Sequence, residues 1–141
     1  MSGKVYPLKG NQRKAADPAL SVWLSASAGT GKTQVLSARV LRLLLEPHVD
    51  PSQILCLTFT KAGAAEMAVR INSVLARWVR IDETTLGKEL GYLGAANDPE
   101  TRARARTLFA SVLDCPGGGL DRKSTRLNSS HVRTSRMPSS A

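Results

Sequence analysis

The sequence predicts an α/β fold, a parallel sheet with flanking helices, because two short apolar runs are each followed by a helical pattern. Residues 21–26 read as a first buried strand, and residues 54–59 read as a second. Helical patterns follow over residues 32–45 and about 64–80. Ligands of such sheets gather at the carboxyl ends of the strands, so we expect functional residues directly after each run.

The first predicted helix has no breaker until Pro47 and carries one broad apolar face. That face consists of Val35, Leu36, Val40, Leu43 and Leu44. A later helix is predicted to begin after Asp98, with Pro99 at its first position and Glu100 in its first turn, and to end near residue 113.

Three arginines of that later helix, Arg102, Arg104 and Arg106, occupy alternate positions. They could form a stripe that binds nucleic acid, or they could belong to an ordinary solvated face. Alternate residues of a helix point in different directions, which favours the solvated face.

The charge balance favours an anionic partner, of which nucleic acid is the commonest, because the net charge is +9. Residues 1–120 hold 15 basic and 10 acidic side chains, whereas residues 121–141 hold 5 and 1. No run approaches the roughly 18 apolar residues that a membrane span needs, and Cys56 and Cys115 stand far apart in the sequence. We therefore expect a cytoplasmic protein without a membrane partner.

The most informative motif is the glycine-rich loop over residues 26–33, which ends in Gly31-Lys32-Thr33 between the predicted strand and helix. Backbone N–H groups freed by Gly29 and Gly31 can converge on phosphates, and the helix N-terminus adds positive potential. Lys32 would reach the β- and γ-phosphates of ATP, and the Thr33 hydroxyl would ligate Mg²⁺. The other predicted nucleotide-binding residues are Ala26, Ser27, Ala28, Thr30 and Gln34. The structural alternative is a turn that only caps a helix.

Three segments in order resemble the first motifs of UvrD-like superfamily one DNA helicases. They are Asn11-Gln12-Arg13-Lys14-Ala15, the glycine-rich loop, and residues 57–67 with the sequence Leu-Thr-Phe-Thr-Lys-Ala-Gly-Ala-Ala-Glu-Met. The resemblance implies a RecA-like P-loop NTPase core in which the Gln12 amide holds adenine. The loop variant and the Pro-Gly-Gly before residue 120 are most similar to AddA-type subunits of double-strand-break repair.

By the same resemblance, residues 57–67 contact single-stranded DNA. Phe59 would stack on a base, the Thr60 hydroxyl would meet a backbone phosphate, and Lys61 would add positive charge. Many relatives have Asn-Lys where this chain has Lys61-Ala62. The alternative for Phe59 is a place in the hydrophobic core.

The resemblance implies a parent enzyme that couples ATP hydrolysis to movement along single-stranded DNA, acts on DNA ends and works with a second helicase/nuclease subunit. The acidic pair that hydrolysis requires is absent, because Asp82-Glu83 does not follow an apolar strand, so this chain alone is expected to be inactive. Two other functions stay open: another P-loop enzyme such as a kinase, and a DNA-binding module without catalysis.

The chain is predicted to divide near residue 120. Residues 1–120 would form the N-terminal part of an ATP-binding domain, and residues 121–141 a disordered, non-native tail. Residues 121–131 match the translation of a common sequencing-adapter oligonucleotide in one frame. The alternative is a basic Ser/Arg-rich arm that binds nucleic acid.

Overall fold

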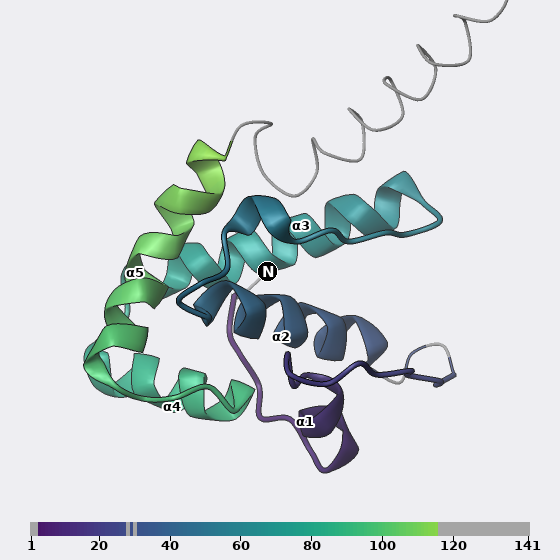
Figure 1. The fold of residues 1–141 in the computed structure, drawn as a ribbon, viewed down its shortest axis with the longest axis horizontal. Helices are drawn as coiled ribbons and strands as arrows, with labels where there is room; N and C mark the ends of the chain where they lie inside the picture. The colour runs from purple at the N-terminus through teal and green to yellow at the C-terminus, as the bar shows by residue number, and fades with distance from the viewer. Residues whose placement is uncertain (1–2, 28, 30, 116–141) are drawn as a thin grey trace, which may run out of the picture.

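The computed structural model describes residues 3–27, 29 and 31–115, and the regular secondary structure in this part of the chain is entirely helical (Figure 1). The predicted tail lies outside the described residues. The helices are α1 (Asn11–Ala15), α2 (Lys32–Leu45), the short 3-10 helix η1 (Pro51–Gln53), α3 (Lys61–Trp78), α4 (Glu83–Leu93) and α5 (Pro99–Asp114).

The prediction of an α/β fold with a parallel sheet is wrong for the described residues, which contain no strand. Residues 21–26 are exposed along their whole length, and residues 54–59 bury only Ile54 and Cys56 in part. No backbone hydrogen bond joins the two runs within the described chain. A β-strand exists only through hydrogen bonds to a neighbouring strand, and an apolar run does not supply that neighbour.

The prediction for α2 is confirmed, because the helix spans Lys32–Leu45 as expected. Val35, Val40 and Leu44 are buried, but Leu36 from the predicted apolar face is exposed. The helix ends where Glu46 turns to an extended backbone, one residue before Pro47.

Helices α4 and α5 begin at aspartate caps. The Asp98 carboxylate accepts a hydrogen bond of 2.7 Å from Thr101 N, and Pro99 occupies the first helical position, as predicted. The Asp82 carboxylate accepts the equivalent bond of 2.9 Å from Thr85 N. Asp82 therefore starts a helix, α4, that the sequence analysis did not predict.

The core forms where α3 packs against both α2 and α5 (Figure 1). Trp78, Ile71 and Leu75 of α3 are fully buried, as are Leu86 and Leu90 of α4. Removing such side chains from water is the main favourable contribution to folding. Because α2 contributes Leu44 to the same core, the glycine-rich loop at its N-terminus is attached to a rigid support.

Two of the three α5 arginines, Arg104 and Arg106, bind the C-terminal ends of other helices. Arg104 donates to the carbonyl oxygen of Leu44 (2.9 Å), in the last turn of α2, and to that of Val49 (2.7 Å), after the helix. Arg106 donates to Trp78 O (2.9 Å) at the end of α3. Carbonyls in the last turn of a helix lack intrahelical partners and carry negative potential, so guanidinium groups stabilise them. The solvated-face interpretation is wrong for these two arginines, which are half-buried and bonded to the protein.

Candidate nucleotide and nucleic-acid site

The glycine-rich loop has the backbone conformation that its glycines permit. Gly29 (φ 79°) and Gly31 (φ 88°) both lie in the left-handed region, which costs other residues about 1–2 kcal/mol. Gly31 is also the residue from which α2 starts. Two residues of the predicted loop, Ala28 and Thr30, lie outside the described residues.

Lys32 closes the described part of the loop. Its Nζ donates a hydrogen bond of 2.7 Å to the carbonyl oxygen of Ala26, at the opposite side of the loop. An ammonium group has three hydrogens, so this bond leaves two for an anion. Thr33 is exposed in the first turn of α2, and its carbonyl accepts a 2.7 Å bond from Ser37 Oγ. Lys32 and the helix N-terminus thus offer positive potential at one exposed end of α2, and Thr33 adds a hydroxyl there.

Gln12 lies next to this loop, although nineteen positions separate it from Gly31 in the sequence. Its Oε1 accepts a hydrogen bond of 3.0 Å from Lys9 N, which orients the amide. A Cβ built on Gly31 would lie 3.7 Å from Gln12 Nε2 and 3.8 Å from Gln34 Oε1. The structure therefore brings together three of the predicted nucleotide-binding residues. Their chemistry, amides beside a basic loop, fits a nucleotide with a hydrogen-bonding base and a charged phosphate chain.

The predicted DNA-binding segment forms a tight turn before α3. Thr58 Oγ1 donates to Thr60 O (2.6 Å), and Thr60 N donates to Thr58 Oγ1 (3.3 Å). Thr60 Oγ1 accepts from Gly63 N (3.0 Å), so this hydroxyl also caps α3. Thr60 retains its own hydroxyl hydrogen for a phosphate.

Phe59, at the tip of this turn, is fully exposed, and Lys61 beside it is exposed as the first residue of α3. The alternative that placed Phe59 in the core is therefore wrong in this structure. An aromatic ring in water next to a lysine and a helix N-terminus suits a base and its phosphate.

One contributor to this region, Arg39, was not predicted. From α2 it donates to the carbonyl oxygens of Ala15 (3.0 Å) and Asp17 (2.7 Å), just after Gln12. Its signal in the sequence is weak: it is one of two arginines, with Arg42, in the apolar second half of a helix. The partners could not be found, because backbone carbonyls are present at every position.

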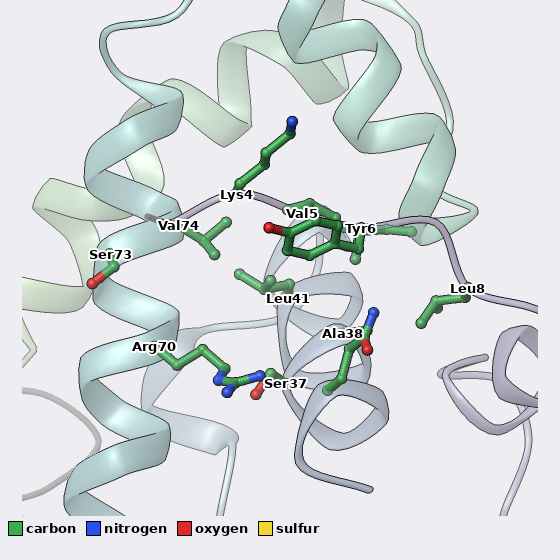
Figure 2. A pocket seen from close by; sticks show the side chains of 13 residues that line it. Lys4, Val5, Tyr6, Leu8, Ser37, Ala38, Leu41, Arg70, Ser73 and Val74 are labelled. Carbon is green, nitrogen blue, oxygen red and sulfur yellow. The ribbon is translucent and has the colours of Figure 1, made fainter. Parts of the chain in front are cut away.

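A pocket of about 340 Å³ lies beyond Gln34, between the N-terminal segment, α2 and α3 (Figure 2). Val5, Leu41 and Val74 contribute apolar surface to its lining. Figure 2 shows Arg70 extending from α3 toward Ser37 on α2, with the Tyr6 ring above Leu41. Gln34 lies both in this lining and beside the loop.

Few of the described side chains are placed to bind a metal ion. Among the residues that the structure describes, no three His, Cys, Asp or Glu side chains form a group that could hold a metal ion. The magnesium prediction therefore depends on the hydroxyl of Thr33. None of the described helices is both long enough and apolar enough to cross a membrane.

Comparison with known protein families gives one match that covers most of the chain. Residues 8–113 match the UvrD/REP helicase N-terminal domain. The chain belongs to this family. In this UvrD/REP domain, the matched span contains Gln12, the loop and Phe59, and it stops before the predicted tail.

Individual relatives agree with the family. The chain is 44% identical over 79 residues to an ATP-dependent helicase/nuclease subunit of Pelotomaculum thermopropionicum, covering 53% of this chain and 6% of that protein. It is 48% identical over 95 residues to the protein of the same name in Desulforamulus reducens, covering 64% and 7%. It is 50% identical over 52 residues to the ATP-dependent DNA helicase PcrA of Bacillus subtilis, covering 37% and 7%.

This UvrD/REP chain thus spans less than a tenth of the length of these relatives. No solved structure gives a significant match to it. The resemblance to UvrD-like helicases, and to AddA-type proteins among them, is confirmed at the level of the family and of these relatives.

Proposed function

We propose that this chain is the ATP- and DNA-binding part of a helicase that moves along single-stranded DNA in double-strand-break repair. The observation that carries the proposal is the position of the Gln12 amide beside Gly31, directly before Lys32 and Thr33. One amide for a base and one basic loop for phosphates lie within a single nucleotide's length of each other.

In this proposal ATP binds at the N-terminus of α2 together with Mg²⁺. Backbone N–H groups of the loop and the Lys32 ammonium hold the phosphates, and the Thr33 hydroxyl ligates the metal ion. The proposal also assigns phosphate binding to residues 26–30, with Gln34 at the edge of the loop. Bound ATP supplies the phosphoanhydride bond whose hydrolysis would drive movement in the whole protein.

The DNA-binding part of the proposal concerns the turn before α3. Phe59 stacks on a base of the single strand, while Thr60 and Lys61 contact its phosphates. Relatives are named as subunits of a helicase/nuclease. For the whole protein we therefore propose a second helicase/nuclease chain as partner, DNA ends as substrate and a cytoplasmic location.

The ATP proposal is tested by isothermal titration calorimetry of the 141-residue chain with ATP and Mg²⁺. Lys32→Ala should weaken binding by about 10- to 100-fold, because a charged hydrogen bond to phosphate is lost. Lys88→Ala removes an exposed lysine of α4 and serves as the matched control. Equal binding by both variants would refute the role of Lys32.

The DNA proposal is tested by fluorescence anisotropy with a labelled single-stranded oligonucleotide. Phe59→Ala should weaken binding by about tenfold, since base stacking contributes roughly 1–3 kcal/mol. Tyr92→Ala, which removes an exposed aromatic ring from α4, is the control. If the chain binds the oligonucleotide, and neither added ATP nor the Lys32→Ala substitution changes that affinity, a DNA-binding module without catalysis is the better interpretation. If ATP binds and the oligonucleotide does not, another P-loop enzyme is favoured.

A further inference from the structure

Arg39 connects α2 to the end of α1 and the segment that follows it. The proposed function requires α2, which begins at the phosphate loop, and α1, which carries Gln12, to keep a fixed relative position. Arg39 lies on α2, two turns after the loop, and its guanidinium donates to the carbonyl oxygens of Ala15 (3.0 Å), Asp17 (2.7 Å) and Leu20 (2.5 Å). These three carbonyls follow Gln12 and lead toward the first loop residues. A single side chain thus binds the first half of the connection between α1 and the loop.

Helix α1 depends on such support. It has only five residues, far fewer than an isolated helix needs for stability in water. Ala15 O belongs to its last turn, where carbonyls have no partner inside the helix. Ala16 is fully buried in the core directly after it. The position of α1 therefore depends on contacts with the rest of the protein. Two of these contacts are polar: Arg13 donates to Gly91 O of α4 (3.0 Å), and Arg39 donates to Ala15 O (3.0 Å).

The consequence concerns the distance between the base-binding amide and the phosphate-binding loop. Gln12 is carried by α1, whereas Gly31 and Lys32 begin α2, the helix that also carries Arg39. By bonding to the end of α1 and the segment after it, Arg39 fixes α1 relative to α2. Gln12 Nε2 is thereby held 3.7 Å from the point where a Cβ on Gly31 would lie. The neighbouring ion pair from α2, Arg42 to Asp17 at 3.7 Å, is longer and acts on the same connection.

A carboxamide in a fixed place can distinguish purine bases. Adenine presents an amino donor at N6 beside an acceptor at N7, and an amide matches both with its oxygen and its NH₂ group. Guanine presents acceptors at both places, so the same amide loses one bond. Gln12 Oε1 already accepts from Lys9 N, and its second lone pair is available for the N6 amine. The match depends on position, because hydrogen bonds weaken steeply when donor and acceptor are displaced.

We propose that Arg39 is a positioning residue that sets the Gln12 amide relative to the phosphate loop and thereby gives the chain its preference for ATP over GTP. This inference rests on the proposed nucleotide-binding function. Lysine cannot replace Arg39, because an ammonium has no planar fork that reaches three carbonyls at once.

The test is the ratio of the dissociation constants for GTP and ATP, each with Mg²⁺, measured by calorimetry on the 141-residue chain. The unsubstituted chain should prefer ATP by about tenfold, and Arg39→Lys should bring the ratio close to one. Inorganic tripolyphosphate, which has no base, should bind both proteins equally. A general loss of stability would not change a ratio of two nucleotides in this way.

Arg104→Lys is the matched control. Arg104 also donates to carbonyl groups, but at the C-terminal end of α2, away from the loop. This variant should unfold at lower temperature and keep the ATP preference. A folded Arg39→Lys protein that also keeps the preference would overturn the inference and leave the proposed function standing.

Two further outcomes separate the proposals. If the unsubstituted chain binds neither nucleotide, the proposed function and this inference fall together. If it binds ATP and GTP equally and Lys32→Ala abolishes both, only the inference falls.

Amide hydrogen exchange gives a second measurement without a variant, should Arg39→Lys not fold. ATP with Mg²⁺ should slow exchange at Ala16 N and Asp17 N, which bond to Gln12 O and Lys14 O, whereas tripolyphosphate should not. Protection confined to the loop and α2 would contradict the coupling.

Discussion

The buried carboxylate of Glu89 accepts a hydrogen bond of 3.0 Å from the indole Nε1 of Trp78. Glu89 is only 2% exposed, and its second oxygen accepts from Arg77 Nε, also at 3.0 Å. The carboxylate on α4 is thus satisfied by two neighbouring residues at the end of α3. A buried charge that loses such partners is costly, so the three residues stabilise the α3–α4 junction as a unit.

Glu89→Ala should destabilise the chain by about 2–3 kcal/mol. The loss is below that of a fully buried ion pair because the Arg77 side chain keeps 32% of its surface exposed. Glu89→Gln retains an acceptor for the indole and should cost only about 1 kcal/mol. Urea unfolding followed by circular dichroism measures both variants. Lys88→Ala, at the adjacent exposed position, should change little, and equal effects of all three substitutions would contradict the role of Glu89.

Acid should weaken the starts of α4 and α5. Hydrogen bonds from the Thr85 hydroxyl and backbone lower the pKa of Asp82, and the Thr101 backbone and hydroxyl lower the pKa of Asp98. A pKa that is lower in the folded than in the unfolded state stabilises above the unfolded value, near 3.9, and this stabilisation is lost as the pH falls through the folded value.

We therefore expect helix content to fall below about pH 4 as these two carboxylates are protonated. Asp82→Asn with Asp98→Asn keeps capping oxygens that do not titrate. Circular dichroism from pH 7 to pH 2.5, about the range over which aspartates titrate, should show a flatter acid dependence for the double variant. The same acid response in both proteins would assign the effect to other carboxylates.

Gly31→Ala should lower the free energy of unfolding by about 1 kcal/mol, because φ at this position is 88°. Gly91→Ala is the matched control inside α4, where a Cβ would meet nothing within 4 Å. It should stabilise the chain by roughly 0.5–1 kcal/mol through lower chain entropy in the unfolded state. Thermal unfolding of both variants checks the opposite signs, and a stabilised Gly31→Ala protein would show that the loop does not need this conformation.

The origin of residues 121–141 is open to a direct measurement. We expect native DNA, amplified with a primer inside codons 20–60, to depart from this sequence after codon 120 and to continue in an open frame with an Asp-Glu motif. If the native gene instead encodes these residues and then a stop, the tail is genuine. The helicase proposal should then be replaced by that of a short basic binding protein.

The sequence by itself determined the features that depend on neighbouring residues. The bounds of α2, the aspartate cap and proline at the start of α5, and the glycines of the loop follow from propensity, capping and backbone freedom within a few positions. The order of the three motifs was also sufficient to indicate the UvrD/REP family. The roles of Lys32, Thr33, Phe59 and the other site residues stay predictions.

Only the tertiary structure decided which groups meet across the chain. Two apolar runs did not become strands, because strands need partners that the runs themselves do not provide. Arginines expected in water bind carbonyls up to 60 positions away, and Glu89 is buried because Trp78 and Arg77 reach it from α3. The partners of Arg39 are decided in the same way, since hydrogen bonds to distant backbone atoms leave no pattern in the sequence. Gln12 lies beside Gly31 only because the tertiary structure brings α1 to the loop.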